Sequence, residues 1–102
     1  MDRRQAIDTL RTHETKLKAA GILSVSVFGS TGRGDAGESS DIDVAVRLAD
    51  SFSKGGFDYF GRLEELERQL SRLLGCKVDI VEEPVHKRRF QAQIDKDRAL
   101  AF

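Results

Sequence analysis

The sequence predicts an α/β protein of the α+β kind, built from a small mixed β-sheet with helices packed on one side. Three observations lead to this class. Long segments near the start and middle carry apolar residues at helical spacing, short segments rich in Val and Ile alternate with polar residues, and glycines separate the two kinds. No Gly/Pro-rich linker interrupts the chain, so residues 1–102 are expected to form a single small domain.

The first expected helix covers residues 3–20. Asp2 stands three residues ahead of Gln5, as in a helix capping box, and Gly21 follows the last helical position. Residues at helical spacing form one stripe, comprising Ala6, Leu10, His13, Leu17 and Ala20. This stripe predicts an amphipathic helix, in which His13 is a half-buried packing residue.

Two strands are expected next, with a glycine-rich loop between them. Residues 22–28 alternate Val and Ile with serines, and residues 41–47 form the second apolar segment. The loop 29–40 joins them. Residues 48–57 contain serines and two adjacent glycines, and they predict a connection.

The second half of the chain predicts a helix, a strand and a short helix. Residues 58–74 have the most regular helical pattern, and Gly75 stands where a helix C-cap belongs. Residues 77–81 alternate as a strand, which Pro84 ends. The tail 85–102 predicts one short helix before a final turn or edge strand.

The composition excludes several classes of protein. The 17 basic and 17 acidic residues cancel, which argues against a protein that mainly grips nucleic acid nonspecifically. The single Cys76 cannot form an internal disulfide, and the two distant histidines offer no zinc-site spacing. No apolar run suits a signal peptide or a membrane span, so a cytoplasmic location without membrane contact is expected.

Two carboxylates stand at the start of the second strand. On extended backbone Asp41 and Asp43 point from one face, while Ile42 and Val44 point from the other. Two like charges held so close favour a bound cation. Oxygen ligands suit hard cations, so the sequence predicts Mg²⁺, with Mn²⁺ as a possible substitute, completed by waters and substrate phosphates.

The loop before these carboxylates has features of a phosphate site. The Gly29-Ser30 turn can present backbone N–H groups to phosphate oxygens, and Gly29 lets the backbone come close. Ser30 adds a hydroxyl. Arg33, followed by Gly34, offers a planar set of donors for phosphate oxygens or for departing pyrophosphate.

These motifs together resemble the signature of the minimal nucleotidyltransferases, within the DNA polymerase β-like superfamily. The resemblance rests on Gly29-Ser30, Arg33-Gly34 and Ser40-Asp41-Ile42-Asp43, and the strand containing Asp79 resembles that family's third carboxylate. It implies a nucleotidyltransferase fold. It also implies that Asp41, Asp43 and Asp79 are catalytic metal ligands, and that Gly29, Ser30, Arg33 and Gly34 bind the nucleotide.

The resemblance also implies a reaction and a partner. Chains of this size resemble the antitoxin of a toxin–antitoxin pair, whose partner is a helical HEPN ribonuclease toxin. The leading hypothesis is a type VII-like antitoxin that transfers AMP from ATP to a tyrosine hydroxyl of a cognate HEPN toxin, with Mg²⁺. Two alternatives stay open: nucleotide transfer to a tRNA 3′ end or a small molecule, and an antitoxin that acts by binding alone.

A basic run at residues 86–89 has two interpretations. Lys87, Arg88 and Arg89 follow His86, and residues 86–98 carry a local excess of positive charge. Such a run is typical of a solvated helix face. It also suits a contact surface for the nucleotide, for an RNA end or for an acidic partner.

Overall fold

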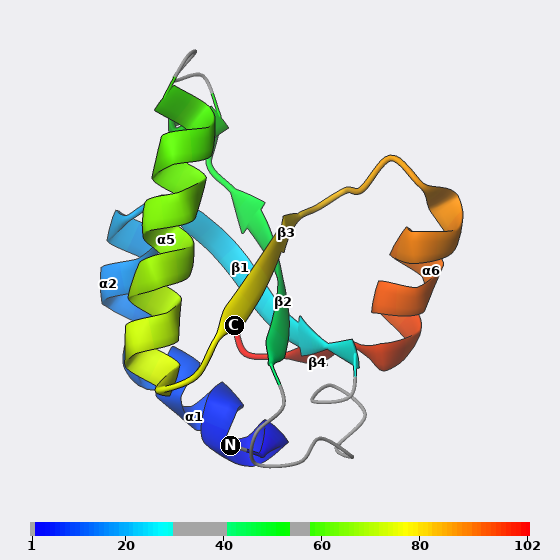
Figure 1. Cartoon of the computed structure of the whole chain (residues 1–102), viewed down its shortest axis with the longest axis horizontal. Helices are drawn as coiled ribbons and strands as arrows, with labels where there is room; N and C mark the ends of the chain where they lie inside the picture. The colour runs from blue at the N-terminus through cyan, green and yellow to red at the C-terminus, as the bar shows by residue number, and fades with distance from the viewer. Residues whose placement is uncertain (1, 30–40, 54–57) are drawn as a thin grey trace.

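The computed structural model describes residues 2–29, 41–53 and 58–102. Its helices and strands follow one another in an order close to the predicted one (Figure 1). The elements are α1 (Arg3–Thr12), α2 (Glu14–Ala19), β1 (Ile22–Phe28), β2 (Ile42–Leu48), α4 (Asp50–Ser53), α5 (Tyr59–Leu74), β3 (Val78–Glu82), α6 (Arg88–Asp97) and β4 (Ala99–Leu100).

The strands of the described residues form one four-stranded mixed sheet in the order β3-β2-β1-β4. β1 pairs antiparallel with β2 and with β4, whereas β2 and β3 run parallel. The parallel pair needs a crossover connection, which α5 supplies. The predicted α/β class with a small mixed sheet is therefore confirmed, and the tail ends in the expected edge strand.

The main core lies between one face of the sheet and the helices α1, α2 and α5. Alternate strand residues such as Val27, Val44 and Val78 point into it, and Leu10 of α1 and Leu70 of α5 meet them, all with no exposed surface. Each such side chain contributes about 1.5–3 kcal/mol when it leaves water. Of the stripe predicted for residues 3–20, the core buries Ala6, Leu10 and Leu17, His13 is half-buried as expected, and Ala20 is exposed.

The expectation that helices pack on one side of the sheet needs a correction. Ile94 of α6 is fully buried against Phe28 and Ala45, whose side chains point to the face opposite the main core. Figure 1 shows α6, in orange, on the far side of the sheet from α5. The second face carries a small apolar patch, and α6 packs on it because its Ile94 would otherwise be exposed.

Local sequence signals set the helix ends. The backbone N–H of Gln5 donates to Asp2 Oδ1 at 2.8 Å and Asp2 N–H donates to Gln5 Oε1 at 3.0 Å, which completes the predicted capping box. Gly75 ends α5 in the left-handed conformation, with φ +71°. The predicted helix 3–20 is divided at His13, whose Nδ1 lies 2.9 Å from the carbonyl oxygen of Thr9.

A buried ion pair attaches α6 to the sheet. The carboxylate of Glu83, just after β3, is almost fully buried. It accepts hydrogen bonds from both terminal guanidinium nitrogens of Arg98, with Nη1 at 2.9 Å from Oε1. Arg98 also donates to Ser26 Oγ at 3.0 Å, and Gln91 donates to Glu83 at 2.6 Å. The hydrogen bonds from Arg98 are the main reason that the pKa of Glu83 is lowered.

No helix in the ranges that the structure describes is long and apolar enough to cross a membrane.

Removal of the Arg98 side chain tests the importance of this ion pair. Arg98→Ala leaves the Glu83 carboxylate buried without its cation, so we expect the free energy of unfolding at pH 7 to fall by about 3–5 kcal/mol. Urea unfolding monitored by circular dichroism measures the loss. Arg72→Ala is the control, because Arg72 is exposed and its pair with Glu65 at 3.5 Å is worth at most about 1 kcal/mol.

The same pair predicts a pH dependence. Because folding lowers the pKa of Glu83, the contribution of the pair is present above the ordinary glutamate value of 4.5 and is lost as the pH falls through the lower pKa of the folded state. The stability difference between wild type and Arg98→Ala should therefore shrink as the pH is lowered below 4.5. A difference that stays constant with pH would contradict this assignment.

Candidate active site

The strand register places the candidate carboxylates side by side. Asp43 of β2 lies opposite Asp79 of β3 in the parallel pairing, and opposite Phe28 of β1 in the antiparallel pairing. Ile42 and Val78, the residues just before the two carboxylates, are buried in the main core. Asp79 and Asp43 therefore lie side by side on the other face of the sheet, the face that α6 partly covers, and we call this pair the carboxylate row. Phe28 lies next to Asp43 on the same face.

The environment of Asp43 disfavours its negative charge. Partial burial is the largest cause that raises the pKa of this carboxyl, followed by the charges of Asp79 and then Asp41. Raised values of this kind gather at functional sites, because structural surfaces have no need to hold like charges together. A cation bound beside Asp43 would offset both the loss of water and the repulsion.

Asp41 lies just before β2 and is more loosely held. It is exposed, and its Oδ2 lies 3.9 Å from Lys77 Nζ. The backbone N–H of Ile42 donates to the carbonyl oxygen of Lys77 at 3.0 Å, which keeps the starts of β2 and β3 together. Asp41 is near enough to raise the pKa of Asp43, but it belongs to the rim of the row.

The structure brings Asp43 and Asp79 together but does not gather all three predicted metal ligands around one point. Within residues 2–29, 41–53 and 58–102, no three His, Cys, Asp or Glu side chains converge closely enough to enclose a metal ion. Mg²⁺ commonly uses only one or two carboxylates and takes waters and substrate phosphates as its other ligands. The pair Asp43 and Asp79, with Asp41 at its rim, provides the oxygen donors for such a site.

Gly29 adjoins Asp43, and its lack of a side chain is required. Its φ is +63°, in the left-handed region, and a Cβ atom there would lie 2.6 Å from Asp43 Oδ2. The backbone of Gly29 thus passes directly beside the Asp43 carboxylate. The predicted approach of this backbone to phosphate oxygens stays a prediction. Ser30, Arg33 and Gly34, the other predicted nucleotide contacts, lie outside the described residues.

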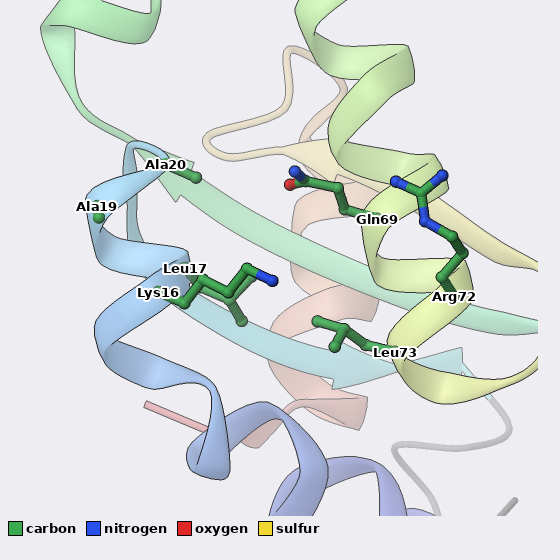
Figure 2. A pocket seen from close by; sticks show the side chains of 7 residues that line it. All are labelled: Lys16, Leu17, Ala19, Ala20, Gln69, Arg72 and Leu73. Atoms are coloured by element: carbon green, nitrogen blue, oxygen red, sulfur yellow. The ribbon is translucent and has the colours of Figure 1, made fainter.

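A groove of about 510 Å³ between α2 and α5 lies away from these carboxylates. Figure 2 shows it with its lining, formed by Lys16, Leu17, Ala19, Ala20, Gln69, Arg72 and Leu73. Both helices pack on the main-core face, so the sheet separates this groove from the row of Asp43 and Asp79. It has no carboxylate in its lining, and we therefore assign the chemistry to the opposite face.

Two side-chain contacts near the sheet were not predicted. Tyr59, predicted as a core residue, does pack against the main core, but its hydroxyl also donates to Glu82, and burial with this contact raises its pKa to about 12. Phe90 of α6 contacts Phe28 beside the carboxylate row, with ring centroids 6.0 Å apart. The sequence gives no spacing signal for either contact, because the partners are far apart along the chain.

Alanine in place of Gly29 tests the close approach to Asp43. Gly29→Ala combines a strained φ with a steric clash, so we expect a loss of about 1–3 kcal/mol in the free energy of unfolding, measured by urea denaturation.

Two other glycines provide matched controls. Gly75→Ala has a similar φ with nothing within 4 Å of its Cβ, so it measures the backbone strain alone. Gly61→Ala, within α5 and also without close neighbours, should raise stability by about 0.5–1 kcal/mol. If Gly29→Ala costs no more than Gly75→Ala, the contact with Asp43 is not a close one.

Comparison with known proteins identifies the family of the chain. A family model described as a nucleotidyltransferase domain matches residues 10–101. A candidate protein adenylyltransferase of Methanocaldococcus jannaschii is 33% identical over 92 residues, which are 88% of each chain. The protein adenylyltransferase MntA of Thermococcus cleftensis is 38% identical over 73 residues, which are 71% of this chain and 68% of that protein.

Solved structures share the same fold. One described as a candidate minimal nucleotidyltransferase has a TM-score of 0.71 at 32% identity, covering 97% of this chain and 95% of that one. A chain of a toxin–antitoxin complex with AMP-PNP has a TM-score of 0.64 at 25% identity, covering all of this chain and 73% of that one. The chain described here therefore belongs to the nucleotidyltransferase domain family and is a nucleotidyltransferase, the enzyme class that its motifs predicted.

Proposed function

We propose that this chain is an Mg²⁺-dependent protein adenylyltransferase that transfers AMP from ATP to a tyrosine hydroxyl of a HEPN-type ribonuclease toxin, and so acts as its antitoxin. The observation that carries the proposal is the pairing of Asp43 with Asp79, beside the close backbone of Gly29, in a chain of this family. The relatives named as protein adenylyltransferases support the choice of a protein acceptor. The toxin–antitoxin structure with AMP-PNP supports an adenine nucleotide and a toxin partner.

The carboxylates have distinct roles in this proposal. Asp41 and Asp43 would hold one Mg²⁺ ion for the triphosphate, and Asp79 would be a ligand of a second ion. Bound Mg²⁺ supplies charge neutralisation at the phosphate oxygens and lowers the pKa of that hydroxyl. The absence of a side chain at Gly29 leaves room for the Asp43 carboxylate beside the backbone. Ser30, Arg33 and Gly34 would provide the phosphate contacts.

The reaction is an in-line displacement at the α-phosphorus of ATP. A bond forms between the tyrosine oxygen and the α-phosphorus, the bond from that phosphorus to the bridging oxygen breaks, and pyrophosphate leaves. The hydroxyl proton passes to Asp79 or to water. The chain contributes mainly position and electrostatic complementarity, which are the two needs of phosphoryl and nucleotidyl transfer.

The proposal predicts a mass change in the partner. When this chain and the HEPN-type product of a neighbouring gene are purified together and given Mg²⁺ and ATP, intact mass spectrometry should show AMP-sized steps on the partner. Asp43→Asn and Asp79→Asn should each slow the transfer by about a hundredfold or more, since each removes a charge that supports the transition state. Glu64→Gln, at an exposed position on α5, is the control and should match wild type.

Other results of this experiment would favour the alternatives. Label from α-labelled ATP that appears on RNA instead of the copurified protein would favour a tRNA 3′ end as acceptor. Toxin neutralisation that survives the double substitution Asp41→Asn with Asp43→Asn would show that binding alone suffices.

The metal requirement gives a separate prediction that does not depend on the acceptor. Mg²⁺ should raise the free energy of unfolding of wild type, by about 3 kcal/mol at a hundredfold excess over Kd, because it binds only the folded carboxylate row. Asp43→Asn should lose most of this gain. In EDTA the same variant should be at least as stable as wild type, because one of the repelling charges is gone. Thermal melting with MgCl₂, with MnCl₂ and with EDTA measures these differences.

A further inference from the structure

An exposed aromatic ring adjoins the carboxylate row. Phe28 ends β1 opposite Asp43 and is 7% exposed, while Phe90 of α6 is 39% exposed and meets Phe28 edge to face, with an interplanar angle of 64°. Phe28 is thus a neighbour of both Asp43 and Phe90. A ligand bound at Asp43 that extends past Phe28 would reach the Phe90 ring.

The position of Phe90 is fixed by its neighbours in α6. Ile94, one helical turn later, is fully buried against the sheet. Gln91, the next residue, donates to Glu83 at 2.6 Å and accepts the backbone N–H of Val85 at 3.0 Å. Arg98 holds the far end of the helix through its ion pair with Glu83. The exposed ring of Phe90 therefore belongs to a firmly attached helix and not to a loose end.

Phe90 differs from the other large apolar side chains that the described residues leave exposed. These are Leu23, Phe60 and Leu100. Leu23 and Leu100 have no ring, and Phe60 lies at the start of α5, where its ring meets that of Tyr59. Of the aromatic residues in the described ranges, Phe90 alone combines an exposed ring with contact to Phe28, the neighbour of Asp43 on β1.

The residues before Phe90 add positive charge to the same end of α6. His86, Lys87, Arg88 and Arg89 are all exposed, and among the described residues their side chains form no ion pair or hydrogen bond. Cations at the start of a helix are unfavourable for the helix itself, because the helix dipole is positive there. Their presence is compatible with an anionic ligand nearby. Proteins that bind single-stranded nucleic acid combine positively charged residues with aromatic rings on which the bases stack, and Phe90 with the neighbouring basic residues has the same composition.

We infer that Phe90 is the stacking surface for the purine base of the nucleoside triphosphate whose phosphates bind at Gly29 and the carboxylate row. This inference rests on the proposed function and adds a base-binding residue to it. The ribose then lies over Phe28, between the base on Phe90 and the α-phosphate at Asp43. Stacking depends on a π surface, so the ring of Phe90 matters more than its bulk.

Nucleotide binding by the full chain tests the inference without any need for the acceptor. Isothermal titration with ATP and with inorganic tripolyphosphate, both in Mg²⁺, should show that Phe90→Ala raises the Kd of ATP roughly 5- to 150-fold. The Kd of tripolyphosphate should not change, because tripolyphosphate has no base. Phe90→Tyr keeps a ring and should retain most of the ATP affinity. Phe60→Ala is the matched control and should bind ATP as wild type does.

A second variant covers the case in which alanine disturbs α6. Phe90→Leu keeps an apolar contact with Phe28 but has no ring, so ATP should again bind more weakly while the melting temperature stays near that of wild type. Full ATP affinity in Phe90→Leu would overturn the inference.

The remaining outcomes separate this inference from the proposed function. Equal weakening of ATP and tripolyphosphate would overturn the inference, because Phe90 would then act through Phe28 on the metal ligands. An unchanged ATP Kd with a raised KM for the partner protein would also overturn it and would make Phe90 a partner contact. A wild-type chain that binds neither ATP nor tripolyphosphate would contradict the proposed function itself.

Discussion

The pairing of β2 with its two neighbours is the constraint on which the candidate site depends. In this register Asp43 stands between Asp79 and Phe28, so one strand brings together a carboxylate pair and an aromatic contact from three separate parts of the chain. A shift by one residue would turn Asp43 into the main core and Ile42 out of it. Burial of Ile42 and Val78 in the main core therefore also holds Asp43 and Asp79 on the opposite face of the sheet.

The same register creates an electrostatic cost that the fold tolerates. Asp43 is partly buried near two like charges, which raises its pKa, and Gly29 brings backbone against it where any side chain would clash. A surface selected for stability alone has little reason to combine these features. The proposed function accounts for both features, because nucleotidyl transfer needs a site that binds a hard cation and phosphate oxygens.

The second face of the sheet links stability to this chemistry. The buried pair of Glu83 with Arg98 and the side chain of Ile94 attach α6 above the sheet, and this attachment sets the position of Phe90 relative to Phe28. Loss of Arg98 would therefore weaken the fold and also loosen the surface beside the carboxylate row. The α2–α5 groove has no such connection, because it lies on the opposite face.

The sequence by itself determined the features that depend on neighbours along the chain. Alternation in 41–47 and 77–81 placed Asp43 and Asp79 on strands, and local capping signals at Asp2 and Gly75 set two helix ends. The phosphate site at the Gly29-Ser30 turn stays a prediction. Only the tertiary structure decided which strands pair and which face α6 covers. It also decided the contacts of Arg98 with Glu83 and of Phe90 with Phe28. The reason is physical: caps and strand alternation are local, whereas register, the choice of face and buried ion pairs depend on packing between segments that are distant in the sequence.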